Sequence, residues 1–310
     1  SDFKVKIMKK INNIFLKKKI LIYGLGKSGI STYNFLRQKA KVNLFDDNPK
    51  NNLRFDKKNL SFAKILQSFF DFIIISPGID VSKCKLSKYL KQNSFKVYTD
   101  LDVFCTFFSN DSVTITGTNG KSTTAKLLYD VLSDQKKDAR LVGNIGNPIL
   151  SEKKITKKTF FVIEASSYQL EYSKIFKSKY SVILNITPDH IERHKSFKNY
   201  INAKFRLIDS QSTKSVDIVK RNDPVILKKL KSKKYKPKII KIDTSLQLPI
   251  FKKIRNKYFM SSGNRENLIF VLKICKILKL NEEKILRTIN KFKGLKYRQQ
   301  IIFDNNYLTI

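Results

Sequence analysis

Residues 113–123 read VTITGTNGKST and contain the residue types that bind a nucleoside triphosphate. The β-branched residues 113–116 predict a buried strand, and two glycines let the backbone turn after it. We expect a helix over residues 124–132, because a helix N-terminus offers free N–H groups and a positive dipole end to phosphate. Lys121 would reach the β- and γ-phosphates, and the Ser122 hydroxyl would bind Mg²⁺. The stretch therefore predicts an ATP site, formed by Gly117, Thr118, Asn119, Gly120, Lys121, Ser122 and Thr123.

Two further polar groups follow apolar stretches in this half of the chain. Residues 159–163 predict a strand that ends at Glu164, whose carboxylate can bind the Mg²⁺ held by the phosphate loop. Residues 180–184 predict the next strand, and His190 lies just beyond it. A lone histidine is more often structural, but at this strand end we favour metal ligation. Lys204 lies in a predicted helix, and composition says nothing of its role because lysines occur throughout the chain.

The first hundred residues carry a second glycine-rich turn. Residues 19–23 predict a strand, GLGKSG follows at residues 24–29, and a helix is expected over residues 30–37. The next predicted strand, residues 41–45, ends at Asp46, which completes a dinucleotide-type fingerprint. The glycines could instead merely allow tight strand–helix packing.

These patterns predict an α/β fold with a domain boundary near residue 107. Residues 1–107 are expected to form a Rossmann-like domain, which also contains a third strand at 72–75. Residues 108–296 would form a P-loop-type α/β ATPase domain, with a strand at 215–219, helices at 264–278 and 282–292, and short strands and loops over 228–258. Residues 297–310 read as the start of a third α/β domain that is truncated.

Bulk composition limits the class of protein. The formal charge of +38 permits a nucleic-acid partner, but the lysines are spread along the chain and no nucleic-acid-binding motif accompanies them. No apolar run approaches the ~20 residues that a membrane span needs. The three cysteines are scattered, which favours a reducing cytoplasm. We therefore expect a cytoplasmic monomer with no nucleic-acid or membrane partner.

Three motifs in order give a resemblance to a known family. The phosphate loop GTNGKST, EASSYQL at residues 164–170 and NITPDH at residues 185–190 together resemble the Mur ligases. GLGKSG, SPGI at residues 76–79 and GNIG at residues 143–146 resemble the branch that joins D-glutamate to UDP-N-acetylmuramoyl-L-alanine. The similarity runs from about residue 18 to residue 310. It implies an ADP-forming acid–amino-acid ligase of peptidoglycan precursor synthesis, hence of cell wall formation and cell division, working through an acyl phosphate.

The resemblance also implies residue roles. Ser122 and Glu164 would hold a first Mg²⁺, and His190 with a carbamylated Lys204 would hold a second. Lys121, His190 and Lys204 would act in catalysis. The substrate contacts would come from Lys27, Ser28, Asp46, Gly78 and Asn144, with the UDP pocket formed by the first four. Asn267 and Arg298 would contact ATP.

Some positions depart from the family pattern. The general phosphate-loop pattern has a glycine at the position of Ile115. This chain lacks that glycine, and in this respect it resembles the short loop of the Mur ligases. Gly263-Asn264 stand where the family usually has His-Asn, and Tyr297 where it usually has His, so contacts on the adenine and ribose side are less well defined. Alternatives are another Mur-type or folylpolyglutamate ligase, a nicotinamide-dependent oxidoreductase resting on GLGKSG, or a basic nucleic-acid-binding NTPase.

Overall fold

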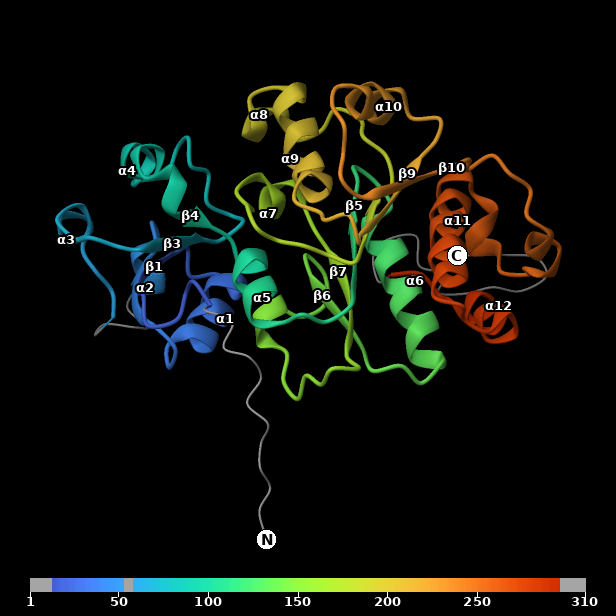
Figure 1. The fold of residues 1–310 in the computed structure, drawn as a ribbon, viewed down its shortest axis with the longest axis horizontal. Helices are drawn as coiled ribbons and strands as arrows, with labels where there is room; N and C mark the ends of the chain where they lie inside the picture. Colours follow the sequence, from blue (N-terminus) through green and yellow to red (C-terminus); the bar gives the residue numbers. More distant parts are fainter. Residues whose placement is uncertain (1–12, 53–57, 296–310) are drawn as a thin grey trace, which may run out of the picture. The chain divides into compact units, whose positions relative to one another are not determined.

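The computed structural model describes residues 13–52 and 58–295. Arg298 and the expected third-domain start at residues 297–310 lie outside these ranges. Packing divides the chain into two units: the first takes the chain up to Ser109 with Ile149–Ser151 and Tyr172–Ile175, and the second takes the remainder. Figure 1 shows parallel strands and helices in each unit. In the described ranges, no helix combines the length and apolar character needed to cross a membrane.

The first unit is built on a four-stranded parallel sheet in the order β2-β1-β3-β4. Its strands are β1 (Lys19–Tyr23), β2 (Lys41–Phe45), β3 (Phe72–Ile75) and β4 (Val97–Tyr98). The helices are α1 (Lys27–Leu36), α2 (Pro49–Asn52), α3 (Phe62–Leu66), α4 (Ser87–Gln92), the 3₁₀ turn η2 (Ser94–Lys96) and α5 (Asp100–Phe107). The Rossmann-like order predicted from GLGKSG is confirmed: strand, glycine turn, helix, parallel strand.

Packing of α1 against β1 depends on one glycine. A side chain at Gly29 would overlap the carbonyl oxygen of Gly24, so only glycine allows this close approach. The Ser76 hydroxyl donates to that same carbonyl at 2.7 Å, which ties the end of β3 to the turn after β1. The glycines therefore fix the edge of the sheet at which α/β folds bind ligands.

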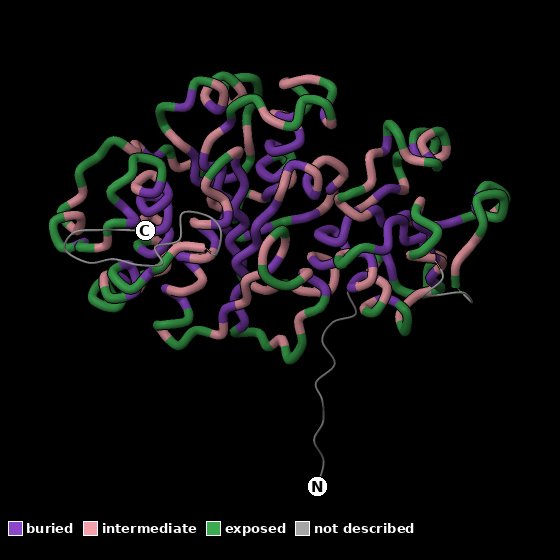
Figure 2. The backbone as a smooth tube through the Cα atoms, turned by 180° about the vertical axis from the view of Figure 1, so that it is seen from behind, coloured by how far each residue is buried: buried purple, intermediate pink, exposed green. Residues whose placement is uncertain are grey.

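The second unit contains a six-stranded parallel sheet in the order β10-β9-β8-β5-β7-β6. Its strands are β5 (Ser112–Thr116), β6 (Ala139–Gly143), β7 (Phe160–Glu164), β8 (Tyr180–Ile183), β9 (Val216–Lys220) and β10 (Lys238–Ile242). Every residue of β5, β7 and β8 is buried, as the purple core in Figure 2 shows. Burial on both faces explains why β7 is almost continuously apolar, and why β5 and β8 add only uncharged serine and threonine to their apolar residues.

Helices cover both faces of this sheet. They are α6 (Lys121–Asp134), α7 (Ser167–Glu171), α8 (Ile191–His194), α9 (Phe197–Asp209), α10 (Pro224–Lys231), α11 (Ser262–Ile277) and α12 (Glu282–Lys291), with 3₁₀ turns η4 (Pro249–Lys253) and η5 (Lys257–Met260). The turn η3 (Ile149–Ser151) packs with the first unit.

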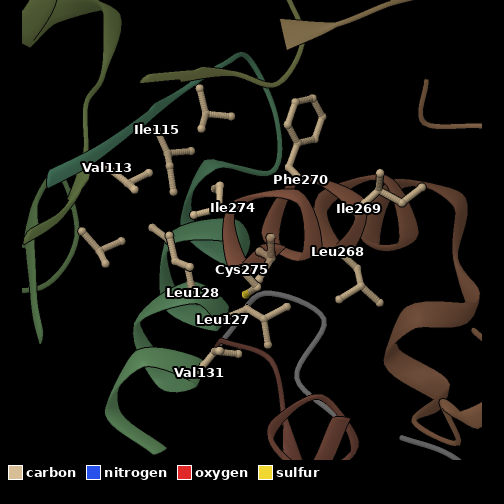
Figure 3. Close-up of a cluster of buried hydrophobic side chains, with 14 of the residues drawn as sticks. Val113, Ile115, Leu127, Leu128, Val131, Leu268, Ile269, Phe270, Ile274 and Cys275 are labelled. Atoms are coloured by element: carbon tan, nitrogen blue, oxygen red, sulfur yellow. The ribbon is translucent and has the colours of Figure 1, made fainter. Parts of the chain in front are cut away.

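Alternation along the strands assigns side chains to the two faces. Val182 and Ile218 pack in the core that contains α6 and α11, whose apolar side chains Figure 3 shows interleaved with those of β5. Ile183 and Val219, one residue on, pack with α9 and α10 on the other face. The central strand β5 is thereby held between two layers, and the loop that follows it has a rigid base.

Two local expectations differ from the structure. Helix α6 begins at Lys121 and not at residue 124, because Gly120 takes the N-cap position with φ 82°. Part of the region expected to hold only short strands and loops is helix α10, which Asp223 caps by accepting from the Ile226 N–H. The Asp-Pro pair at its start is a helix-start signal that composition obscured.

Candidate active site

The phosphate loop lies at the carboxyl end of β5, as predicted. Gly120 has a left-handed backbone, and a side chain there would overlap the Asn267 amide on α11. Asn185, which follows β8, clamps the loop from the other side. Its side-chain oxygen accepts from the Asn119 N–H at 2.9 Å, and its carbonyl accepts from the Thr118 N–H at 2.9 Å. The loop is therefore held between α11 and the end of β8, with the N-terminus of α6 behind it.

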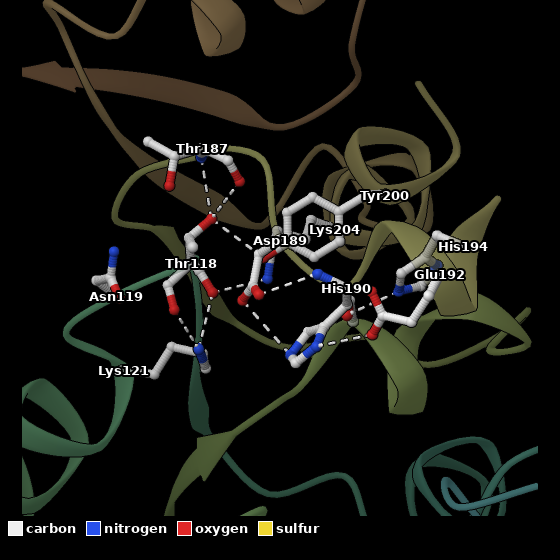
Figure 4. Close-up of polar contacts among 12 residues, drawn as sticks. Thr118, Asn119, Lys121, Thr187, Asp189, His190, Glu192, His194, Tyr200 and Lys204 are labelled. Carbon is white, nitrogen blue, oxygen red and sulfur yellow. Dashed lines mark hydrogen bonds and ion pairs between the residues drawn. The ribbon is translucent and has the colours of Figure 1, made fainter. Parts of the chain in front are cut away.

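Lys121 folds over this loop. Its ammonium donates to the carbonyl of Gly117 at 2.9 Å and to that of Thr118 at 2.7 Å (Figure 4). Ser122, the next residue, is 5% exposed in the first turn of α6. One cation and one hydroxyl thus stand together at a helix N-terminus, the combination that phosphate with a bound metal ion requires.

Glu164 is fully buried at the end of β7, the strand beside β5. Its Oε1 accepts from the Asn144 side-chain amide at 2.8 Å, and its backbone carbonyl accepts from the Asn144 N–H at 2.9 Å. Its Oε2 accepts no hydrogen bond from any described residue. A buried carboxylate oxygen without a donor is costly, so this oxygen is a suitable metal ligand.

Lys204 is also buried, only 1% exposed on α9, and its amine donates to the Gly117 carbonyl at 2.7 Å. Burial, and then the nearby Lys121 ammonium, hold the pKa of Lys204 well below its usual value, against weaker opposite effects of Asp189 and Glu164. Burial therefore favours the uncharged form of the amine. The loop, the Glu164 strand and α9 converge on one place.

His190 begins α8 with a left-handed backbone, φ 52°, and its side chain is 44% exposed. Its Nε2 lies 3.4 Å from Asp189 Oδ2, and its Nδ1 lies 3.9 Å from Glu192 Oε1. Within the described ranges, no three His, Cys, Asp or Glu side chains gather as a metal site would require.

In the first unit, both oxygens of Asp46 accept backbone N–H groups, from Leu25 at 2.6 Å and from Asn48 at 2.8 Å. Asp46 therefore shapes the glycine turn as well as standing at the edge where a ligand would bind. Lys27 and Ser28 open α1, Lys27 exposed and Ser28 half-buried, and Gly78 is exposed in the turn after β3. Asn144 belongs to the other unit.

Several residues of the site were not singled out from the sequence. Asp100 hydrogen-bonds the Ser28 hydroxyl, and burial raises the pKa of Asp100 to about 6. Tyr200 and His194 pack around His190, with the His194 ring edge-on to Tyr200 at 5.3 Å. Of these residues, only Tyr200 could have been found from the sequence, because it lies one helical turn before Lys204 and therefore on the same face of the helix.

Family models match both units. Residues 115–279 match the Mur ligase middle domain, and residues 18–97 match the Mur ligase MurD-like, N-terminal domain.

Curated relatives match along nearly the whole chain. A UDP-N-acetylmuramoylalanine–D-glutamate ligase of Rickettsia bellii is 33% identical over 315 residues, covering 93% of this chain and 69% of that protein. A protein of the same name from Thermoanaerobacter sp. strain X514 is 30% identical over 319 residues, covering 93% of this chain and 70% of that protein.

Solved structures support the fold. That of UDP-N-acetylmuramate:L-alanyl-gamma-D-glutamyl-meso-diaminopimelate ligase from Neisseria meningitides aligns with a TM-score of 0.58 at 14% identity, covering 90% of this chain and 99% of that one. That of UDP-N-acetylmuramate–alanine ligase from Thermotoga maritima aligns with a TM-score of 0.53 at 16% identity, covering 93% and 72%. With both units matched and one-third identity along most of its length, the chain belongs to the Mur ligase family.

Proposed function

We propose that this chain is an ATP-dependent ligase that adds D-glutamate to UDP-N-acetylmuramoyl-L-alanine in peptidoglycan precursor synthesis. The observation that carries the proposal is similarity across both units, over 93% of the chain, to relatives of that name. A phosphate loop in the second unit and a separate glycine turn in the first give one nucleotide site to each unit. This arrangement suits an enzyme with a nucleoside triphosphate and a nucleotide-linked substrate.

The reaction would proceed in two displacements. The alanine carboxylate of the substrate attacks the γ-phosphorus of ATP, the bond to the bridging oxygen breaks, and ADP leaves. The D-glutamate amine then attacks the acyl phosphate, loses a proton, and releases inorganic phosphate as the amide forms. Backbone N–H groups of the loop and of the α6 N-terminus would bind the phosphates, and Lys121 would stabilise charge developing on the transferred group.

Two residues fit a magnesium ion beside the phosphates. Glu164 presents a buried oxygen without a donor, and Ser122 offers a hydroxyl at the same edge of the sheet. When bound, the ion would neutralise phosphate charge. Asn144 holds the other oxygen of Glu164 and would keep the carboxylate oriented. His190 and Lys204 would serve a second ion if CO₂ had added to the Lys204 amine.

The N-terminal unit would bind the uridine diphosphate group through Lys27, Ser28, Asp46 and Gly78. We assign UDP binding to residues 1–107 and ATP binding to residues 108–296, with Asn267 and Arg298 contacting ATP. No disulfide joins Cys84, Cys105 and Cys275, all of which lie in the described ranges, and this is consistent with the reducing, cytoplasmic compartment that we propose. We propose a monomer that acts without a nucleic-acid or membrane partner.

Product analysis tests this proposal. The purified chain is incubated with ATP, Mg²⁺, UDP-N-acetylmuramoyl-L-alanine and labelled D-glutamate, and ADP and labelled amide are measured. A second reaction replaces D-glutamate by hydroxylamine, which traps an acyl phosphate as a hydroxamate. We expect ADP formation that depends on the muramoyl substrate. ATP hydrolysis stimulated by DNA instead, or binding of NAD in place of UDP, would contradict the proposal and favour an alternative.

A further inference from the structure

Tyr200 lies where the phosphate loop and the Lys204 helix meet. Its side chain is 1% exposed, and it projects from the first turn of α9. Two histidine rings pack against the Tyr200 ring, His194 edge-on at 5.3 Å and His190 at 6.4 Å between centroids. Behind them, the Tyr168 ring stacks on His194 at 5.6 Å. Packing on these sides leaves the Tyr200 ring little freedom.

The Tyr200 hydroxyl contacts the phosphate loop. It lies 3.0 Å from the Thr118 hydroxyl (Figure 4). That threonine hydroxyl also accepts from the Thr187 N–H at 3.0 Å and donates to the Thr187 carbonyl at 3.1 Å. Because the single threonine proton goes to the carbonyl, the tyrosine proton goes to the threonine oxygen. Every hydrogen-bonding group of this set is then satisfied.

The Tyr200 ring contacts Lys204. These residues are one helical turn apart on α9, and the lysine nitrogen lies 4.6 Å from the ring centroid. The same nitrogen donates to the carbonyl of Gly117, the residue before Thr118. One tyrosine therefore contacts the loop twice, directly through its hydroxyl and indirectly through the lysine that its ring supports.

We infer that Tyr200 is a positioning residue that couples the phosphate loop to Lys204. Loop N–H groups bind phosphate well only if their directions are set before the ligand arrives. Bonds to Thr118 and Gly117 from α9 set the first half of the loop, while α6 sets the second. The inference rests on the proposed function, since it takes ATP as the ligand of this loop.

Two substitutions separate the contributions of hydroxyl and ring. Tyr200→Phe removes the hydroxyl and keeps the ring, and it should weaken ATP binding about 5- to 10-fold, as loss of one buried hydrogen bond does. Tyr200→Leu also removes the surface that supports Lys204 and should weaken ATP binding further. Tyr235→Phe is the matched control: its hydroxyl donates to the Lys229 carbonyl at 3.3 Å on α10. It should leave ATP affinity unchanged.

Calorimetry with ATP and with UDP provides the measurement, and hydrogen exchange of residues 117–120 provides a readout independent of activity. In Tyr200→Phe we expect weaker ATP binding, unchanged UDP binding and faster exchange in the loop. Thr118→Val combined with Tyr200→Phe should be no worse than Thr118→Val alone, because Thr118→Val already removes the bond to Tyr200 together with the two bonds to Thr187.

The outcomes separate the inference from the proposed function. Failure of the unsubstituted chain to bind ATP would overturn the proposed function. Normal ATP binding by both Tyr200→Phe and Tyr200→Leu, or strictly additive effects with Thr118→Val, would overturn the inference alone. Equal weakening of ATP and UDP binding in Tyr200→Phe would indicate a general folding role and would also overturn it.

Discussion

Lys204 illustrates how burial changes the chemistry of one side chain. Among dozens of solvated lysines, it lies beneath the phosphate loop with a depressed pKa. A neutral amine is a nucleophile, so it can add CO₂ and lose a proton to form a carbamate, which replaces a cation by an anion. That change would turn a residue that repels Mg²⁺ into one that binds it.

Carbamylation can be detected directly. With ¹³C-labelled bicarbonate at neutral pH, we expect a carbamate carbon signal in the NMR spectrum of the unsubstituted chain. Lys204→Arg should lose the signal, because a guanidinium stays protonated and does not add CO₂. Lys198→Arg, an exposed position on the same helix, should keep it. A signal of equal strength in Lys204→Arg would show that another amine reacts.

Lys121 is predicted to provide the main positive charge beside the transferred phosphate. Lys121→Ala should lower ATP turnover ~10²-fold or more, comparable to removing one preorganised charge stabiliser from other active sites. The thermal midpoint should change little, because Lys121 follows a loop and donates to the loop carbonyls of Gly117 and Thr118. The control is Lys126→Ala on the same helix, which removes an i,i+4 pair with Asp130 at 2.6 Å. Such a partly exposed pair contributes little, so turnover should be normal.

Strand β9 carries a carboxylate inside the sheet. Asp217 is 0% exposed and pairs in register with Ser181 on β8. Burial raises the pKa of Asp217 to about 7, against a weaker opposite effect of the serine hydroxyl. Apolar residues take most other positions of this strand, so its surroundings favour the protonated, uncharged form of the carboxyl group.

The protonation of Asp217 predicts a pH dependence of stability. Between about pH 4 and pH 7 the folded chain keeps a proton that the unfolded chain has lost, so the free energy of unfolding falls as pH rises through this window. Above pH 7 the loss is complete, on the order of 4 kcal/mol. Asp217→Asn should flatten the slope and raise the thermal midpoint at pH 8.

Denaturant unfolding at several pH values measures this slope. Asp111→Asn serves as the control, because that carboxylate is exposed and pairs with Lys179 at the surface. It should retain the slope of the unsubstituted chain. A slope unchanged in Asp217→Asn would mean that other groups determine the pH dependence.

At the scale of the whole molecule, two nucleotide sites in two packing units predict separable effects of ligands. A ligand that binds only the folded state raises the unfolding temperature of the unit that binds it. UDP should therefore protect the N-terminal unit and ATP the second unit. Hydrogen exchange with peptide resolution measures both, with residues 19–45 reporting on UDP and residues 112–134 on ATP.

NAD provides the contrast for the same experiment. The glycine turn and Asp46 also fit a dinucleotide fingerprint, but a dehydrogenase has no use for the second phosphate loop. We expect no protection by NAD at the concentration at which UDP protects. Protection of the first unit by NAD alone would revive the oxidoreductase interpretation.

Much of the architecture was determined by the sequence itself. Strand, glycine turn and helix follow one another within a few residues in both units, so local patterns were enough to predict both loops and most strands of the two sheets, but not β4 or β6. The motif order also determined the family, which the relatives confirm. Helix α10 was missed because a lysine-rich composition hid its capping signal.

Tertiary structure alone decided how the site is held together. Asn185 clamps a loop residue 66 positions earlier, and Tyr200 reaches Thr118 across 82 positions. The burial of Lys204 and the free oxygen of Glu164 likewise depend on which strand ends and helices meet. The spacing of apolar residues along a helix or strand indicates which of its faces is buried, but not which other element packs on that face. Partners far apart in the sequence are chosen by the packing of whole layers, and only the folded chain brings them within bonding distance.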